Sequence, residues 1–240
     1  MDKFNYYVIH CKDNNIRFNN IKNMEKKLAK EINIYFGIKG NEIKNLNIYD
    51  SEIKIQKQFN LIGQLGCFFS HYLLIKSLIY SEYDYTVIFE DDFNILIDNL
   101  DIQINNILNN IDIDFDFLFL GTQSKQFGEI YKDNLYYINQ TEKTWGFQGY
   151  IINNKNINKI LTFLKTINYE VDIQIFKHIK NNDLIGLFVN PIFITQNTNC
   201  ISIIRPPVSQ NIVFNKIIPL NKPLKNRKII SGPKCQIKKK

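Results

Sequence analysis

The chain has little alanine, few cysteines and no long apolar run, and these shortages exclude several classes of protein. Alanine occurs once, at Ala29, while Ile, Asn and Lys dominate, a bias that fits AT-rich codons and carries no information on fold. The four cysteines lie far apart and never form a C-x-x-C pair, which argues against a zinc site or a disulfide framework and favours reduced thiols in a cytosol-like compartment. No apolar segment is long enough to span a membrane, and no cationic stretch precedes the first apolar one, so we expect a soluble, cytoplasmic protein without a signal peptide.

Acidic residues are missing from the end of the chain. No Asp or Glu follows Asp183, whereas ten of the 30 basic residues do, and the other 20 stand against 23 acidic residues. The net charge of +7 therefore comes from the C-terminal segment, while residues 1–183 are mildly acidic. There are three alternatives for such a tail: it is a solvated chain end, it binds an anionic membrane or nucleic acid, or it lies against the phosphates of a ligand. We expect one domain over residues 5–204 and a basic tail over residues 205–240.

Strand-like and helix-like patterns alternate along the chain. Short apolar runs predict strands at 5–11, 46–49, 85–90, 115–122, 135–139, 146–154, 184–191 and 191–197. Apolar residues at helical spacing predict helices over 16–35, 63–81, 104–111 and 157–167, and another after Val171. Strands that alternate with helices favour an α/β fold in which a mixed, mostly parallel sheet is flanked by helices on both faces.

Three consecutive carboxylates end the strand predicted within "YTVIFEDDFN", residues 85–94. Like charges at this spacing repel, and a carboxylate near a core loses hydration, so something must offset that cost. Ligands of open α/β sheets bind at the carboxyl ends of strands, and oxygen-rich clusters hold Mg²⁺ or Mn²⁺ together with phosphate oxygens. Side-chain alternation predicts that Glu90 and Asp92 point one way and Asp91 the other. The alternatives are a metal site beside a diphosphate and a solvated turn or helix cap.

A second segment, "GQLGCFFSHYLLIK" at residues 63–76, combines small and polar residues at a predicted helix start. Gly63 and Gly66 permit close backbone approach, and Ser70 and His71 offer a hydroxyl and an imidazole. The segment alone fits a helix that packs closely as well as it fits a binding site.

The order of these segments resembles glycosyltransferase family 25, which includes lipooligosaccharide galactosyltransferases and procollagen galactosyltransferase domains. The resemblance spans about residues 5–204, and its most specific parts are the glycine–Ser-His segment and the "EDD" that follows it. The matching segments are "VIHCKDNNIRFNNI", "GQLGCFFSHYLLIK", "VIFEDDF", "FLFLGT", "TWGFQGYIIN", "VDIQI" and "NPIFITQN".

The resemblance implies a GT-A fold whose acidic motif holds Mn²⁺, or Mg²⁺, against the diphosphate of a UDP-sugar. Asp92 is the first metal ligand that it implies, with Asp91 as a second, and Gln196 is a candidate from the C-terminal half, where no acid or histidine is available. Arg17 is expected to pair with the diphosphate or to lie on a helix surface. Donor-binding roles are implied for His10, Cys11, Arg17, Ser70, His71, Glu90, Asp91, Trp145 and Gln148, with Phe147 beside the last two in a sugar-facing wall.

The resemblance also implies inversion at the sugar, which requires a base to take the proton of the acceptor hydroxyl. Asp172 matches the acidic residue of the family, although an aspartate at this place also fits a helix cap, and Glu170 is the alternative. The implied function is transfer of galactose from UDP-galactose to a glycan or to hydroxylysine of a collagen-like protein. The competing hypothesis is a non-catalytic binder of nucleic acid or an anionic surface, driven by the basic tail. The acidic body and the lack of a nucleic-acid motif argue against nucleic acid as a partner.

Overall fold

A computed structural model describes residues 3–45, 53–56, 59, 62–123, 128–138 and 146–200. The strand predicted at 46–49, Trp145 and the basic tail at 205–240 lie outside these residues. Among the helices that the model describes, none combines the length and the apolar character needed to cross a membrane.

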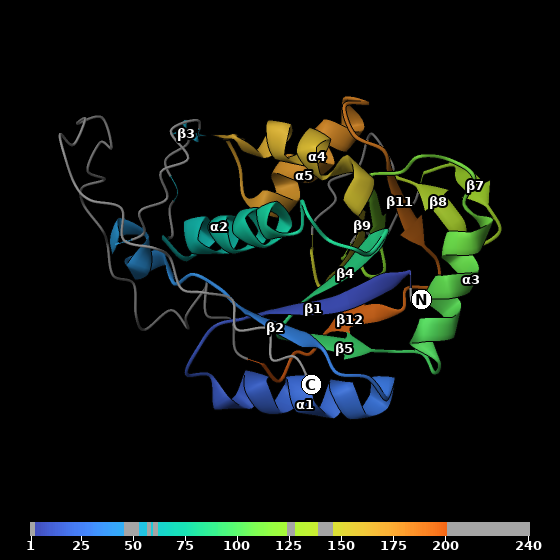
Figure 1. The fold of residues 1–240 in the computed structure, drawn as a ribbon, viewed down its shortest axis with the longest axis horizontal. Coiled ribbons are helices and arrows are strands. Elements are labelled where there is room, and N and C mark those ends of the chain that lie inside the picture. Colours follow the sequence, from blue (N-terminus) through green and yellow to red (C-terminus); the bar gives the residue numbers. More distant parts are fainter. Residues whose placement is uncertain are drawn as a thin grey trace.

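The centre of the structure is an eight-stranded mixed sheet (Figure 1). The pairings make six of its eight strands run in one direction, and β8 and β9 run against them. The predicted mixed, mostly parallel sheet is therefore confirmed. The strands lie in the order β2 (Asn33–Phe36), β1 (Phe4–His10), β4 (Tyr85–Glu90), β9 (Gly149–Asn153), β6 (Phe117–Phe119), β11 (Gly186–Val189), β8 (Leu135–Tyr137) and β7 (Ile130–Lys132).

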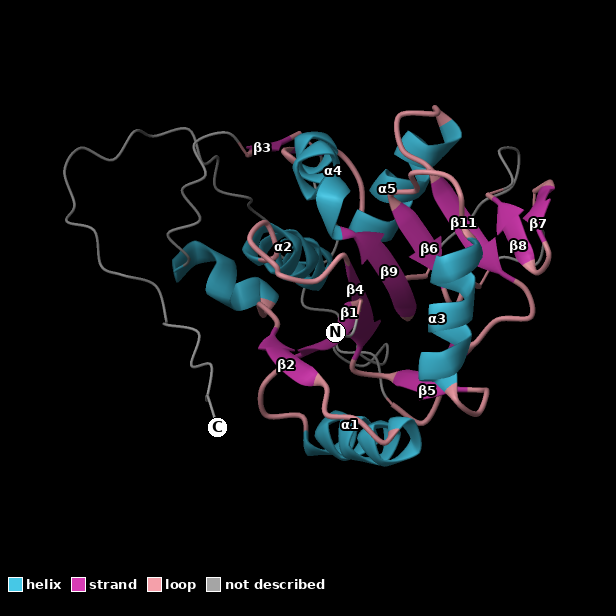
Figure 2. Cartoon of the chain, turned by 45° about the vertical axis from the view of Figure 1, so that its right-hand side comes forward, coloured by secondary structure: helices cyan, strands magenta, loops and turns pink. Residues whose placement is uncertain are grey.

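Helices cover both faces of the sheet, because each strand carries apolar side chains on both sides. Helices α2 (Ile62–Ser77), α4 (Ile157–Leu164) and α5 (Val171–Lys180) lie on one face, and α1 (Asn15–Leu28) and α3 (Leu100–Asn110) lie on the other (Figures 1 and 2). In β4, Ile88 belongs to the core on the α2 side, whereas Val87 and Phe89 belong to the core on the α1 side. The two cores make β4 a rigid support for the residues at its end.

Short elements complete the fold around this framework. Strand β5 (Phe93–Ile95) pairs antiparallel with β12 (Ile194–Gln196), and β3 (Lys54–Ile55) pairs parallel with β10 (Thr166–Ile167). Two 3₁₀ helices, η1 (Gly40–Asn45) and η2 (Asn154–Asn156), follow β2 and β9. Because β12 lies beside β5, a segment near residue 196 reaches the loop that follows β4.

The helix predicted over 16–35 is shorter than its apolar spacing indicates. The Asn14 side chain accepts a hydrogen bond from the backbone N–H of Arg17 and so caps the start of α1. The helix ends at Leu28, and Ala29 turns the chain with a left-handed φ of 54°. Tyr35 lies in β2, parallel to β1, so the prediction of helix up to Tyr35 was wrong. The helix predicted to Ile167 likewise ends at Leu164, and Ile167 lies in β10.

Candidate functional site

The three carboxylates lie where the parallel strands β1 and β4 end side by side. Ile9 is in register with Glu90, so the backbone after β1 runs next to Asp91. On the other side, Gln196 of β12 is in register with Phe93, which directly follows Asp92. The edge of the sheet thus gathers polar groups from three segments that are far apart in the sequence, as expected for a site at the carboxyl ends of strands.

Asp91 is surrounded by hydrogen-bond donors. Its Oδ2 accepts from His10 Nδ1 at 2.9 Å and from the backbone N–H of Cys11 at 3.2 Å, and its Oδ1 accepts from Arg17 Nη1. Both oxygens are therefore engaged by protein groups. These contacts tie the ends of β1 and β4 to helix α1.

Arg17 is buried between two carboxylates, so it is not a surface arginine. Its side chain contacts Asp91 through Nη1, and its Nη2 lies 3.0 Å from Asp92 Oδ2. The residue as a whole is only 8% exposed. A guanidinium that bridges two acids orients both of them, because its donors lie in one fixed plane.

Asp92 is buried, and one of its oxygens has no hydrogen-bond partner among the described residues. Its Oδ2 accepts from Gln196 Nε2 at 2.9 Å and contacts Arg17, whereas Oδ1 is buried and unpartnered. Burial raises the pKa of Asp92 from 3.8 to about 6; the charge of Glu90 adds to the effect, and Arg17 opposes it. A buried carboxylate oxygen without a donor fits a hard divalent cation, which prefers oxygen ligands.

Glu90 lies apart from the other two acids. Its Oε1 is 3.3 Å from His71 Nε2 and 4.0 Å from Cys67 Sγ, both on helix α2. The prediction that Glu90 and Asp92 share a face and Asp91 lies opposite does not hold. Strand β4 ends at Glu90, so the alternation ends there too, and both Asp91 and Asp92 reach Arg17.

The Ser-His segment of α2 divides into two different environments. His71 is buried, and its Nδ1 lies 2.7 Å from the Tyr150 hydroxyl oxygen while its Nε2 faces Glu90. Ser70 instead donates to the carbonyl of Gly66 at 2.7 Å and accepts from the backbone N–H of Ile38 at 2.8 Å. The hydroxyl of Ser70 therefore fixes the loop after β2 to α2. Its one proton is already donated to Gly66 and is not available for the predicted contact with a nucleotide.

The glycines of this segment allow the same loop to approach. A Cβ atom at Gly66 would lie 2.6 Å from the carbonyl oxygen of Ile38, which is closer than real Cβ atoms come. A Cβ at Gly40 would lie 2.4 Å from the carbonyl oxygen of Ile62. Close packing of the loop against α2 thus explains Gly66 of the segment and Gly40 of the loop.

Asp172, the predicted base, lies in the first turn of α5 on the α2 side of the sheet. Its Oδ2 accepts from the backbone N–H of Gly146 at 3.1 Å, and its Oδ1 accepts from that of Ile173 at 2.8 Å. Burial raises the pKa of Asp172, and the two N–H groups partly oppose this. Glu170, not Asp172, occupies the N-cap position, and it accepts a hydrogen bond from Gln64 Nε2 at 2.9 Å. Asp172 is therefore held by backbone donors without serving as the cap.

Two residues of the predicted sugar-facing wall, Phe147 and Gln148, belong to the described part of the chain. Phe147 is buried, and its ring lies 4.5 Å from that of Tyr150 and 5.4 Å from that of His71, so it belongs to the core and was wrongly placed in the wall. Gln148 is also buried, and its Oε1 has no hydrogen-bond partner in the described part of the chain. Trp145 lies outside the described residues.

Two asparagines that the sequence did not single out hold the acidic turn in place. Asn20 of α1 donates through Nδ2 to the carbonyls of Asp91 and Phe93, at 3.1 and 2.8 Å. Asn197 donates through Nδ2 to Asn20 Oδ1 at 2.9 Å, and its backbone N–H donates to the carbonyl of Asp92. Asparagine is so abundant in this chain that its presence gave no signal.

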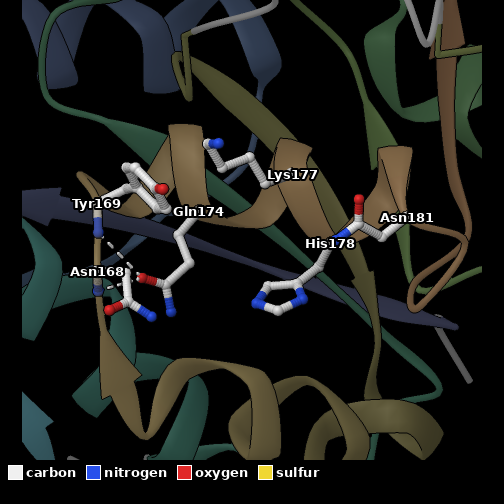
Figure 3. A pocket seen from close by; sticks show the side chains of 6 residues that line it. All are labelled: Asn168, Tyr169, Gln174, Lys177, His178 and Asn181. Atoms are coloured by element: carbon white, nitrogen blue, oxygen red, sulfur yellow. Dashed lines mark hydrogen bonds between the residues drawn. The ribbon is translucent and has the colours of Figure 1, made fainter.

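A cavity of about 210 Å³ lies beside α5, and no predicted site residue lines it (Figure 3). The Gln174 amide in its wall accepts from the backbone N–H groups of Asn168 and Tyr169 and donates to the carbonyls of Phe163 and Thr166. Lys177 lies over the ring of Tyr169, with Nζ 4.3 Å from its centroid. The Gln174 amide is thus fully used by backbone groups, and His178 Nδ1 lies 2.9 Å from Asp183, so neither group needs a ligand to explain it.

Comparison with known proteins adds one family match. The model of glycosyltransferase family 25, described as an LPS biosynthesis protein, matches residues 3–175. Among solved structures, a single-residue variant of the Drosophila β1,4-galactosyltransferase 7, in complex with manganese, UDP-Gal and xylobiose, is similar to this chain. The identity is 11% over 95% of this chain and 82% of the other, with a TM-score of 0.40, a likeness too distant to inform the site. A search of curated proteins found no match.

Proposed function

The chain belongs to glycosyltransferase family 25, and from this premise we propose that it transfers galactose from UDP-galactose to a hydroxyl group of a glycan. We further propose that the reaction requires a divalent metal ion, Mn²⁺ or Mg²⁺, and inverts the anomeric carbon. Hydroxylysine of a collagen-like protein is the second acceptor class to be tested.

The observation that carries this proposal is the unpartnered Oδ1 of Asp92 at the end of β4. Asp92 would hold the metal ion directly, whereas Asp91 already has a protein donor at each oxygen. When bound, a divalent cation neutralises the diphosphate of the leaving nucleotide. Arg17 and Gln196 orient the Asp92 carboxylate through contacts of 3.0 and 2.9 Å to its Oδ2.

The donor nucleotide is proposed to lie along the edge that these strands form. His10 and Cys11 stand at the end of β1, directly beside the acid cluster, and would border the uracil. His71 holds Glu90 from the α2 side, so Glu90 would contact hydroxyl groups of the donor sugar.

Asp172 is the proposed base for the acceptor. Its carboxylate is oriented by the N–H groups of Gly146 and Ile173, and burial raises its pKa, which makes it a better proton acceptor than an exposed aspartate. It takes the proton of the attacking hydroxyl as the bond from the anomeric carbon to the diphosphate breaks. The proposal is supported by the position of Asp172 in α5 and by the contact of Glu90 with His71 of α2, because these two helices cover the same face of the sheet.

A donor screen with the full chain tests the proposal. UDP-galactose, UDP-glucose and UDP-N-acetylglucosamine are each incubated with Mn²⁺ and with simple galactosides or hydroxylysine, and products are identified by mass spectrometry. We expect transfer from UDP-galactose that EDTA abolishes. The matched variants are Asp92→Asn, which should lose activity, and Asp98→Asn, which changes an exposed aspartate nearby and should keep it. Transfer that survives both EDTA and Asp92→Asn would reject the metal-dependent site.

A further inference from the structure

Glu90 belongs to a second group of potential metal ligands, which is separate from the Asp92 carboxylate. The Sγ of Cys67, a ring nitrogen of His71 and a carboxylate oxygen of Glu90 all lie within 4.8 Å of one another. Cys67 and His71 are four residues apart on α2, so both side chains project from the same face of the helix. Glu90 reaches them from the end of β4. Two rigid elements thus bring a sulfur, a nitrogen and an oxygen to one point.

The spacing of these atoms is close to that of a tetrahedral zinc site. Zinc bonds of about 2.0 Å to nitrogen and oxygen and about 2.3 Å to sulfur place tetrahedral ligand atoms about 3.3 Å apart for N and O, and about 3.5 Å apart for S and O. The corresponding distances are 3.3 Å from His71 Nε2 to Glu90 Oε1 and 4.0 Å from Cys67 Sγ to the same oxygen. The Cys67 sulfur therefore lies about half an ångström too far from Oε1, and its distance to the His71 nitrogen is within 4.8 Å, so the Cys67 side chain has to move toward both atoms when zinc binds.

The donor set also distinguishes this group from the Asp92 site. Thiolate and imidazole ligands suit zinc, whereas Mn²⁺ and Mg²⁺ prefer oxygen. We propose that Cys67, His71 and Glu90 form a binding site for Zn²⁺, with water in the fourth position; the lack of a C-x-x-C pair argued against zinc in the sequence, but this site needs only one cysteine. With Zn²⁺ bound, the Oε1 of Glu90 is a metal ligand and is not available to the donor sugar; the other parts of the proposed transfer reaction are unaffected.

The residues around His71 fix the orientation of its ring in a way that suits a metal ligand. The imidazole is buried, and the hydroxyl oxygen of Tyr150, 2.7 Å from Nδ1, fixes the ring so that Nε2 points at Glu90. A partner at the second ring nitrogen is a regular feature of metal-binding histidines, because it sets both tautomer and orientation. Tyr150 is itself in the core on strand β9, so its hydroxyl is held in a fixed position.

Cys67 must lose a proton for the site to form. Burial raises the pKa of the Cys67 thiol well above its ordinary value, and the charge of Glu90 adds to this, so the metal-free thiol is protonated at neutral pH. Binding forms a sulfur–zinc bond and releases the thiol proton to the solvent, with no change in oxidation state. The bound ion would then link α2 to the end of β4, and it should raise the melting temperature.

Cobalt spectroscopy on the metal-free full chain tests this site without reference to activity. Co²⁺ takes the place of Zn²⁺, and a thiolate ligand produces an intense near-ultraviolet charge-transfer band together with the visible bands of a tetrahedral ion. We expect the wild type to show both and Zn²⁺ to remove both by displacement. Cys67→Ser should lose the charge-transfer band, whereas a variant with Cys11, Cys200 and Cys235 all replaced by serine should keep it.

Further variants separate loss of the site from loss of the fold. Tyr150→Phe should keep the band but weaken the affinity about 10- to 100-fold, as expected when the partner of a histidine ligand is removed. Asp92→Asn should bind Co²⁺ with the same spectrum as the wild type, although it loses the oxygen-rich site. Glu90→Gln should weaken Co²⁺ binding, and its melting temperature in EDTA should not fall below that of the wild type, because the charge of Glu90 adds to the cost of the buried Asp92 carboxylate. The proposal is rejected if the wild type shows no thiolate band, or if the band persists in Cys67→Ser.

Discussion

Replacement of Asp92 by asparagine should stabilise the metal-free protein, even though it removes a charge that contacts Arg17. Asp92 is only 3% exposed, and its pKa is raised from 3.8 to about 6 by burial and by the charge of Glu90, against the opposing effect of Arg17. A carboxyl group with a raised pKa in the folded state is more stable there in its neutral form. Asparagine resembles that neutral form in size and carries no charge, so the cost of the buried charge disappears.

The size and the pH dependence of this effect follow from the two pKa values. Above about pH 6 the Asp92 carboxylate is charged in both the folded and unfolded states, and the folded protein bears the full free-energy cost of the buried charge. Below about pH 4 the group is neutral in both states, and this cost vanishes. The pKa rises from 3.8 to about 6, and each unit corresponds to about 1.36 kcal/mol. The stabilisation by Asp92→Asn therefore has an upper limit of about 3 kcal/mol at pH 8. For a chain of this length each kcal/mol changes the melting temperature by about 2–4 °C.

Thermal unfolding in EDTA measures the difference between wild type and Asp92→Asn in a series from pH 8 to pH 4.5. The variant should melt higher at pH 8, and the gap should narrow as the pH falls. With Mn²⁺ and UDP the order should reverse, because a ligand at 1,000 times its dissociation constant adds about 4.1 kcal/mol to the wild type, more than the limit of about 3 kcal/mol, and nothing to a variant that does not bind it. Asp98→Asn is the control at an exposed position. A variant that is less stable at every pH would refute the reasoning, since the contact with Arg17 would then outweigh the cost of burial.

Three further substitutions test other parts of the site. Asp172→Asn should lower kcat by about 10²- to 10⁴-fold and leave the dissociation constant of UDP unchanged; a normal kcat would transfer the role of base to another residue, with Glu170→Gln as the next variant. Arg17→Met should destabilise the protein by about 3–5 kcal/mol in urea unfolding, because two buried carboxylates lose their shared cation. A loss of stability below about 1 kcal/mol would mean that water reaches the two carboxylates. Ser70→Ala should cost about 1 kcal/mol, because the partly buried N–H of Ile38 loses its acceptor. A specific loss of UDP affinity without loss of stability would instead support the predicted role in donor binding.

The sequence predicted those elements of the fold whose pattern is long and regular. The apolar run of β4 and the amphipathic spacing of α3 and α4 are local signals, and the structure confirms these elements. The strands β3, β5, β7 and β10 have two or three residues each and were not predicted. The strands β6, β8 and β12 are equally short but lie within apolar runs that were predicted as strands. Helix α1 was predicted too long because Ile32 and Tyr35 continue its spacing, while pairing with β1 places Tyr35 in a strand instead. That pairing is a tertiary contact and leaves no local trace.

The position of the three carboxylates at the end of β4 was predicted, but the directions in which their side chains point were not. The end of β4 was identified because carboxylates are costly there, and this reasoning needs only the order of residues along the strand. Which way Asp91 and Asp92 face depends on where the strand ends and on Arg17, which comes from a helix 74 residues away in sequence from Asp91. The sequence left Arg17 either on a surface or near a diphosphate. Its burial between the two aspartates could be known only once α1 was packed against the sheet.

Three consecutive carboxylates meet a single arginine in the described part of the chain, and this imbalance has a consequence for the metal. Glu90 is next to His71, and Asp91 has donors at both oxygens, of which one is Arg17. When no ion is bound at Cys67, His71 and Glu90, Arg17 balances one of the three negative charges and two remain, which equals the charge of a divalent ion. Of these three carboxylates, only that of Asp92 has an oxygen that is both buried and unpartnered among the described residues, so the ion can bind there without displacing Arg17. A monovalent cation would leave part of the repulsion uncancelled, and we therefore expect Mn²⁺ to stabilise the wild type far more than Na⁺ or K⁺ at equal ionic strength.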